Sequence, residues 1–182
     1  LSDQYTYKNG TSIQTGSSSA NPVQRSLQSR LDDIVNVRSF GANGDGTDQT
    51  LALQRAIDQL FLPWSSAMDA DSLRKRITLK LDAGLYKISD SLKVPPYVNL
   101  VGDGSDKTVI EQTGAFAVIE TINGNGINAQ TSSTNQSNII KLQGMTLKSY
   151  LTNPALKLSS TKDSQFIDIK LHGPWTQGTA LN

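Results

Sequence analysis

The chain has 182 residues, which is enough for one domain with a substantial hydrophobic core. Its 17 basic and 16 acidic side chains leave a formal net charge of +1 with no basic block, so charge gives no reason to expect a nucleic-acid partner. The absence of cysteine excludes disulfides and thiolate metal sites, and a content of 36% hydrophobic and 18% charged residues favours a β-rich, loop-rich protein over a helical bundle.

Residues 1–22 have the composition of a linker or of the end of an attachment region. The stretch GTSIQTGSSSANP cannot bury enough apolar surface to offset its own ordering entropy. No signal peptide is visible, and no apolar run approaches the roughly 18 residues that span a bilayer, so no membrane partner is expected. Because the sequence begins at Leu1 and stops at Asn182 within a strand-like pattern, we interpret it as an internal part of a longer protein.

Residues 23–35 carry a helical stripe. Val23, Leu27, Leu31 and Ile34 recur at spacings of four, four and three, which predicts a short helix. A helix of roughly three turns is marginal in isolation, so it needs a surface to pack on. That surface is either other copies of this helix in a helical neck or the domain to which the helix belongs. The sequence leaves both open.

The next stretch predicts a strand, a turn and a well-capped helix. Val35 and Val37 alternate with polar neighbours, and GANGDGTDQT follows Phe40. Either Thr47 or Asp48 is placed to cap the helix. Its apolar stripe consists of Leu53, Ala56, Ile57, Leu60 and Phe61, and Pro63 ends it.

The glycine-rich turn raises the question of a bound phosphate or metal. It matches neither GxGxxG nor a Walker sequence, and Asp45 and Asp48 would repel a phosphate. Calcium would find two aspartates without the spacing of an EF-hand. We therefore predict a structural capping motif and expect neither metal nor cofactor. Its residues are Phe40, Gly41, Asp45, Gly46 and Asp48.

From Arg76 onward, short strands alternate with turns. The segment GMTLKS (144–149) is followed at a spacing in the mid-twenties by the similar DIKLHG (168–173), and PALKL from Pro154 is followed at nearly the same spacing by TALN from Thr179. Such a period predicts the coils of a solenoid over residues 36–182, with a β-sandwich as the alternative. A solenoid needs a cap at its first coil, and the amphipathic helix before it fits that role.

The segment IVNVRSFGANGDGTDQTLALQRAID resembles the opening of the pectate-lyase-like right-handed parallel β-helix superfamily. ITLKLDAGLYKISDSLKVPPYVNLVGDGSDKTVIEQ is similar to the first coils of that superfamily. The resemblance implies an all-β solenoid, a right-handed parallel β-helix with an N-terminal capping α-helix. It is less specific for function, because this fold carries lyases, hydrolases and binding proteins.

The lead-in SLQSRLDDIVNVRSFGA resembles the junction before the β-helix of bacteriophage tailspikes and tail fibres. This implies a homotrimer that binds and depolymerises bacterial surface polysaccharide, capsule or O-antigen. It also implies assembly in the bacterial cytoplasm, a place in the virion tail, and contact with other tail proteins through the N-terminal region. The alternatives are a non-catalytic virion adhesin or adaptor, and a secreted pectinase-like lyase or hydrolase.

The acidic residues offer no convincing catalytic pair. Asp82 and Asp106 stand one such period apart, but both lie at turns. Glu111 and Glu120 are too close in sequence to share a face of adjacent coils and so belong to different strands, and Asp168 alternates outward beside Lys170. The catalytic residues stay unknown, and the resemblance implies that they lie further along the β-helix or between subunits.

Four residues are candidates for carbohydrate contact. His172 stands at a strand end in LHGPW without a neighbouring acid or base, and Trp175 could stack on a sugar ring or pack in a corner. Asn125 and Asn128 belong to the polar stretch 123–138, whose composition suits hydroxyl-rich ligands, an intersubunit contact or disorder equally.

Overall fold

The computed structural model describes residues 4–6, 24–31, 33–61, 78–122, 139–150, 153–159, 161 and 163–173. The chain divides into two compact units, Leu1–Ile34 and Val35–Asn182. None of the helices in these described ranges has the length and apolar character needed to cross a bilayer.

The first unit contains a shorter helix than predicted. Strands β1 (Gln4–Thr6) and β2 (Gln24–Ser26) pair antiparallel, and α1 covers only Leu27–Leu31. Leu27, Leu31 and Ile34 are 52%, 58% and 61% exposed. The helix expected over 23–35 therefore does not extend through this stretch, because a short amphipathic helix without a covering apolar surface gains too little from packing.

The second unit opens with the elements predicted for its start. Strand β3 (Ile34–Asn36) leads into a 3-10 turn, η1 (Val37–Phe40), and then into β4 (Asp45–Asp48) and α2 (Thr50–Phe61). Helix α2 buries three residues of its predicted stripe, since Leu53, Ala56 and Ile57 are at most 2% exposed, whereas Leu51 on the opposite side is 80% exposed. Leu60 is partly buried against the core, and the side chain of Phe61 lies outside the described part of the structure.

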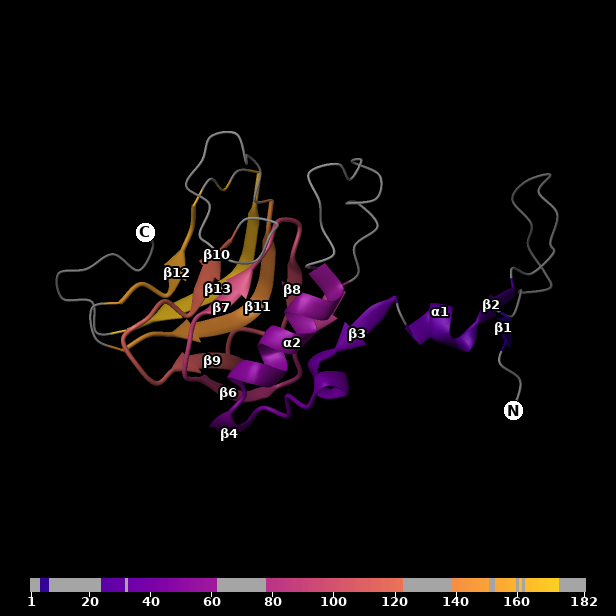
Figure 1. Cartoon of the computed structure of the whole chain (residues 1–182), viewed down its shortest axis with the longest axis horizontal. Coiled ribbons are helices and arrows are strands. Elements are labelled where there is room, and N and C mark those ends of the chain that lie inside the picture. The colour runs from indigo at the N-terminus through magenta and orange to yellow at the C-terminus, as the bar shows by residue number, and fades with distance from the viewer. Residues whose placement is uncertain are drawn as a thin grey trace. The chain divides into compact units, whose positions relative to one another are not determined.

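The later strands are short and stack in parallel (Figure 1). They are β5 (Thr78–Lys80), β6 (Gly84–Ile88), β7 (Leu92–Val94), β8 (Asn99–Val101), β9 (Thr108–Gln112), β10 (Ile119–Thr121), β11 (Lys141–Lys148), β12 (Leu156–Lys157) and β13 (Gln165–His172).

These strands form three faces within the described part of the chain. Face A contains β3, β5, β8 and the first halves of β11 and β13. Face B contains β4, β6, β9 and the second halves of β11 and β13. Face C contains β7, β10 and β12. Successive turns of chain around these faces make a parallel β-helix, and the parallel pairing excludes the β-sandwich.

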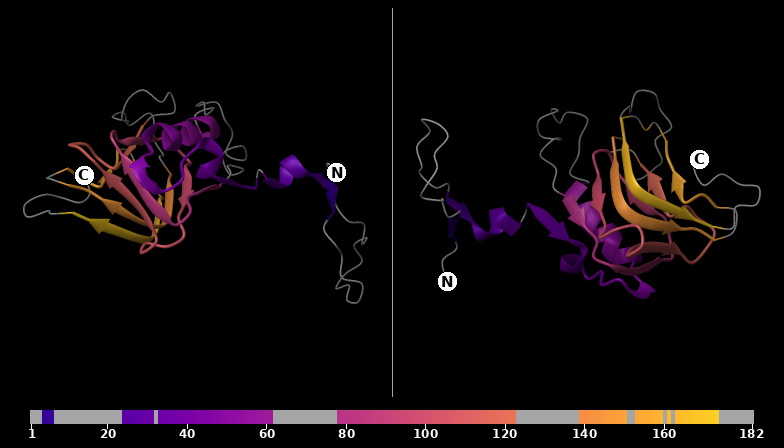
Figure 2. Two further views of the ribbon diagram at one scale, coloured as in Figure 1. Left: turned by 90° about the horizontal axis from the view of Figure 1, so that it is seen from below. Right: turned by 180° about the vertical axis from the view of Figure 1, so that it is seen from behind.

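The predicted period is confirmed where it could be tested. Met145 pairs with Ile169 and Lys148 pairs with His172, so the two similar segments run side by side as β11 and β13 (Figure 2). The corner between faces A and B falls at Gly144 and, one coil later, at Asp168, with φ of 66° and 50°. In the other predicted repeat, the second copy begins at Thr179, outside the described residues.

The interior is a set of apolar stacks, one per face. Each stack takes one inward side chain from three successive coils, and every member is at most 2% exposed. The stacks are Leu79–Leu100–Leu142, Tyr86–Ile110–Leu147 and Leu92–Ile119–Leu156. Burial of each large apolar side chain contributes roughly 1.5–3 kcal/mol, so these stacks hold the coils together.

Candidate functional site

The glycine-rich turn hydrogen-bonds to itself. Asp45 Oδ1 accepts from the Thr47 N–H at 3.0 Å, the Thr47 hydroxyl at 2.6 Å and the Gln49 side-chain amide at 2.9 Å. The bonds from Thr47 lower the pKa of Asp45 below its ordinary value. Among the described residues, no cluster of three His, Asp or Glu side chains could hold a metal ion.

Asp48 links the start of α2 to the first coil. Its Oδ1 accepts from the N–H and hydroxyl of Thr50, at 2.9 and 2.5 Å, and its Oδ2 accepts from the Ser89 hydroxyl at 2.6 Å. The hydrogen bond from the Ser89 hydroxyl has the largest effect in lowering the pKa of Asp48, and the bonds from Thr50 have the next largest. Thr47, the other capping candidate, bonds to Asp45 instead.

The remaining residues of the capping motif shape the backbone. Phe40 packs partly buried against the core, and the Gly41 N–H donates to the Arg38 carbonyl at 3.0 Å, ending η1. Gly41 and Gly46 have φ of 95° and 82°, a region that glycine adopts without a Cβ penalty.

Gln54 of α2 fixes the first strand of face C. The Lys93 N–H donates to Gln54 Oε1 at 2.9 Å, and Gln54 Nε2 donates to the Lys93 carbonyl at 3.1 Å. A neighbouring strand would make the same two bonds. The capping helix therefore satisfies the strand edge of β7 and holds Lys93 in place.

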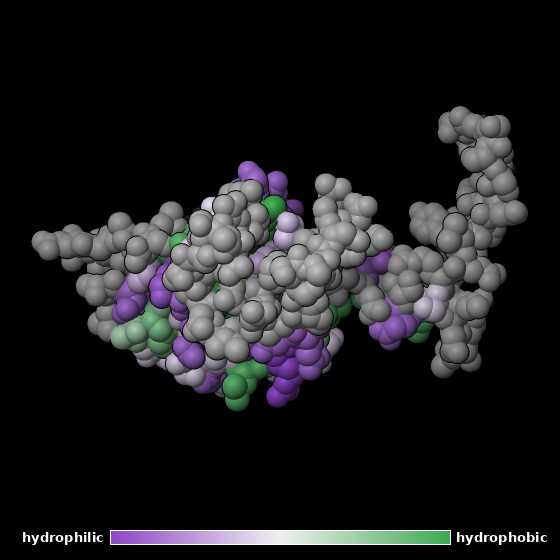
Figure 3. Space-filling model, turned by 45° about the horizontal axis from the view of Figure 1, so that its top comes forward, coloured by the Kyte–Doolittle hydropathy of each residue, from purple (hydrophilic) through white to green (hydrophobic). Residues whose placement is uncertain are grey.

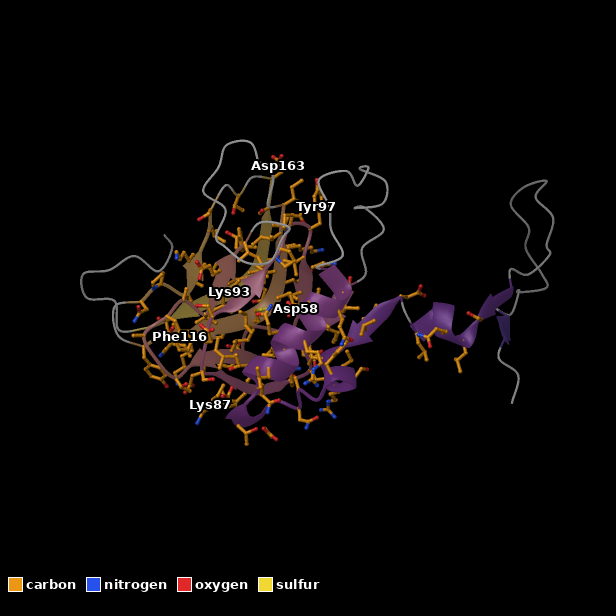
Figure 4. The ribbon with its side chains drawn as sticks, in the orientation of Figure 1. Asp58, Lys87, Lys93, Tyr97, Phe116 and Asp163 are labelled. Atoms are coloured by element: carbon orange, nitrogen blue, oxygen red, sulfur yellow. The ribbon has the colours of Figure 1, made fainter. Side chains whose placement is uncertain are left out.

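Face C carries a hollow of about 430 Å³ that spans three coils. Figure 4 labels two of its residues, Lys93 and Phe116. Its lining comes from β7 and the residues before it, from the turn before β10, from β10 itself, and from β12 and the residues before it. These residues are Asp90, Ser91, Lys93, Ala115, Phe116, Ala117, Glu120, Asn153, Pro154 and Lys157.

Three of the lining residues form an ion-pair ladder across the strands of face C. Lys93, Glu120 and Lys157 are in register on β7, β10 and β12. Glu120 accepts from Lys93 Nζ at 3.0 Å and from Lys157 Nζ at 2.7 Å, and its side chain is 12% exposed. Burial by itself would raise the pKa of Glu120, but the bonds from Lys157 and Lys93 outweigh it and lower the pKa. Glu120 is therefore a stable carboxylate at neutral pH.

The other functional groups of the hollow are an aromatic ring and a second carboxylate. Asp90 is exposed and accepts only the Ser91 N–H, at 2.7 Å, among the described residues. Phe116 is half-buried, and a Cβ on Gly114 would lie 2.9 Å from its ring. A ring flanked by hydrogen-bonding groups is the chemistry that sugar-binding sites use.

Face B carries a second polar cluster, around Glu111. Its carboxylate accepts from Lys148 Nζ and from the Tyr150 hydroxyl, both at 2.9 Å, and these bonds lower its pKa although burial opposes them. Lys148 also lies 5.1 Å from the centre of the Tyr150 ring. All three groups are satisfied by one another, which is typical of a structural cluster between coils.

The two acidic residues that stand one period apart in sequence have different partners in the structure. Asp82 binds Arg38 at 2.7 Å and Asn36 at 2.8 Å, whereas Asp106 binds Lys170. The turn that holds Asp106 runs from β8 to β9 and is longer than the corner from β5 to β6 that holds Asp82, so the two carboxylates do not occupy equivalent places.

Glu111 and Glu120 belong to different strands, β9 and β10, as the sequence predicted, and these strands lie on different faces. Neither pair therefore occupies equivalent positions on adjacent coils, the arrangement considered for glycoside cleavage.

Asp168 does not continue a simple strand alternation. It lies at the corner within β13, where its carboxylate accepts from the N–H and hydroxyl of Ser105 at 3.0 and 2.6 Å. Lys170 reaches Asp106 rather than Asp168.

Of the four residues predicted to contact carbohydrate, the one that the structure describes does not line the hollow. His172 is exposed at the end of β13, beside Lys148 on face B. Trp175, Asn125 and Asn128 lie outside the described residues.

Sequence reasoning missed the hollow because its residues have no fixed spacing. Lys93 and Glu120 are 27 apart and Glu120 and Lys157 are 37 apart, since the second interval contains the polar stretch 123–138. The signal that could have found them is the shared pattern of an outward charge beside apolar residues in LKV, IET and LK.

Solved structures similar to this chain are β-helix proteins of greater length. ORF18 of Geobacillus virus E2 is similar over 79% of this chain and 26% of its own, with 21% identity and a TM-score of 0.60. The A-module of the mannuronan C-5 epimerase AlgE4 of Azotobacter vinelandii covers 80% of this chain and 35% of its own, with 23% identity and a TM-score of 0.45. The chain thus spans about a quarter to a third of these proteins.

Sequence comparison adds the family. No curated protein matches the chain. The family described as "Rhamnogalacturonase A/epimerase, pectate lyase-like" matches residues 34–181, which include the capping helix and the described coils. The chain therefore belongs to this pectate-lyase-like family of rhamnogalacturonase A and epimerases.

Proposed function

We propose that this part of the protein binds a polysaccharide segment in the hollow of face C. The observation that carries the proposal is the meeting of the Phe116 ring, the Asp90 carboxylate and the Lys93 and Lys157 ammonium groups in one hollow. The ring offers a face for a sugar, and the polar groups fix its hydroxyls. Membership of a family whose name includes a rhamnogalacturonase supports a carbohydrate ligand.

The hollow itself binds rather than cleaves. A general acid for glycoside cleavage needs a pKa raised toward neutral pH, and Glu120 has a lowered one. Depolymerisation is therefore proposed for the full-length protein, with its catalytic groups outside this hollow. The similarity to ORF18 over only 26% of that protein supports further coils in the whole molecule.

The whole protein is proposed to be a phage tailspike or tail fibre that recognises bacterial capsule or O-antigen. The fold it shares with ORF18 of a Geobacillus virus supports this assignment. The exposed Leu27, Leu31 and Ile34 support a homotrimer joined through residues 23–35, with other tail proteins bound nearer the N-terminus.

The test uses full-length protein and purified surface polysaccharide of its host. We expect Phe116→Ala to weaken binding about tenfold, equivalent to ~1.4 kcal/mol, because the sugar loses its stacking face. Gln165→Ala, at an exposed position of face A, is the control and should bind like the parent protein. Equal binding by both variants would contradict the proposal that the hollow binds the polysaccharide.

The same samples separate an enzyme from an adhesin. New reducing ends after incubation indicate hydrolysis, and added ultraviolet absorbance indicates the unsaturated sugar that a lyase leaves. Binding without either product would assign the protein to the adhesins and contradict the depolymerase proposal.

A further inference from the structure

The charged side chains that line the hollow of face C cancel one another. Lys93 and Lys157 contribute two positive charges, and Asp90 and Glu120 contribute two negative charges. No other described residue that lines the hollow is ionisable. The charges of the described lining residues therefore sum to zero, although the hollow is strongly polar.

The positive charges of the hollow are partly offset. Both ammonium groups bind Glu120, at 3.0 and 2.7 Å, and Glu120 lies between them with little solvent contact. An acidic sugar would bring a second carboxylate close to Glu120, which already neutralises one of the two positive charges. Each ammonium group has three N–H donors, so after binding Glu120 it still has donors for hydroxyl groups.

The negative charge that faces solvent is Asp90. It is exposed and forms no ion pair among the described residues. A carboxylate in this position accepts hydrogen bonds from sugar hydroxyls and repels the carboxylate of a uronic acid. Asp90 therefore disfavours acidic sugars and favours neutral ones.

We propose that the hollow of face C selects a neutral pyranose segment and rejects uronic acids, with Asp90 as the specificity-determining residue. This inference rests on the proposed function, that the hollow binds polysaccharide. The ring of Phe116 supplies a stacking face, and Lys93, Lys157 and Asp90 contact the hydroxyl groups.

The first experiment measures binding of full-length protein to an array of neutral and uronic-acid oligosaccharides. Neutral glycans are expected to bind at least tenfold more tightly than acidic ones. Their affinity should change little between about 50 and 500 mM salt, because no net charge is neutralised on binding.

Two substitutions then change the charge of the hollow and so its preference between neutral and acidic glycans. Asp90→Asn keeps the oxygen that accepts the Ser91 N–H, removes one negative charge, and is expected to improve binding of uronic-acid glycans several-fold. Glu120→Gln releases both lysines and should act in the same direction more strongly. Because Glu120→Gln could disturb the fold, the exposed Asp90→Asn keeps the test independent. The matched control is Asp163→Asn, since Asp163 is also exposed and lies outside the hollow.

The outcomes separate this inference from the proposed function. Tighter binding of uronic-acid glycans by the parent protein, or no gain with Asp90→Asn, overturns neutral selectivity while leaving polysaccharide binding in place. An array on which no glycan binds overturns both. Neutral binding that Phe116→Ala weakens and Asp90→Asn redirects supports both.

Discussion

The side-chain amide of Gln54 occupies the position of a peptide group beside β7. It accepts from the Lys93 N–H and donates to the Lys93 carbonyl, and it also donates to Asp58 at 2.8 Å. A strand edge without such bonds would leave a donor and an acceptor unsatisfied in a partly buried place. At the residue scale, this side chain joins the cap to the first coil.

Replacing the side-chain amide of Gln54 tests whether it stabilises the edge of β7. Gln54→Leu keeps a similar size and is expected to lower the free energy of unfolding by about 1–3 kcal/mol, because two backbone groups of Lys93 lose their partners. The matched control is Gln59→Leu, at an exposed position of the same helix, which should change stability by less than about 0.5 kcal/mol. Urea titration of the two variants measures this, and equal effects would contradict the role.

Close packing of the coils depends on glycine at one corner. A Cβ on Gly102 would lie 2.2 Å from the Gly144 carbonyl oxygen and 2.9 Å from Thr108 Cβ. Gly102→Ala is expected to cost roughly 1–3 kcal/mol of stability, measured by thermal unfolding, because the coils would have to separate. Gln165→Ala, at an exposed position, is the control, and a Gly102→Ala variant as stable as this control would contradict the packing argument.

At the scale of elements, the strands of face C are held by charge as well as by apolar packing. Lys93, Glu120 and Lys157 follow the register of β7, β10 and β12, so each coil adds one charge of alternating sign. Because Glu120 is only 12% exposed, breaking the ladder on one side leaves a poorly solvated carboxylate.

This ladder predicts a pH dependence with a definite sign. The pKa of Glu120 in the folded protein is lowered from its ordinary value of 4.5 by Lys157 and Lys93. As the pH falls below that ordinary value, the unfolded chain binds a proton that the folded protein does not, so stability decreases until the folded pKa is passed. Glu120→Gln should flatten this fall in urea titrations at a series of pH values. An unchanged slope would show that the ladder does not contribute.

At the scale of the whole molecule, the described residues form a capped solenoid preceded by a separate first unit. Both hydrophilic and hydrophobic side chains of the described residues reach the face shown in Figure 3. The exposed Leu27, Leu31 and Ile34 belong to the first unit, whose last residue, Ile34, is also the first residue of β3. An apolar stripe of this kind gains stability when copies of the chain cover it.

The proposed trimer is tested by light scattering of the full chain. We expect three times the 19.7 kDa mass of one chain, and a shift to monomer when Leu27 and Leu31 are both changed to Ser. Leu51→Ser on α2 removes a more exposed leucine and should leave the mass unchanged. A monomeric parent protein would contradict the trimer.

Local sequence patterns were sufficient to predict some elements of the structure and insufficient to predict others. The stripe of α2 and the repeat that pairs β11 with β13 were correctly predicted, because helical and strand periodicity report directly which side chains face the core. The helix over 23–35 was predicted too long, because its stripe has no apolar surface to pack on in the described structure.

The sequence by itself predicted a capped solenoid, because turn residues and apolar spacing act within a few residues of one another. It left a β-sandwich open, and only the family resemblance implied a parallel β-helix. Only the tertiary structure decided which polar side chains meet. Phe116, Asp90 and the ladder through Glu120 come from three coils. Their proximity depends on the register between coils, and loops of unequal length hide that register in the sequence.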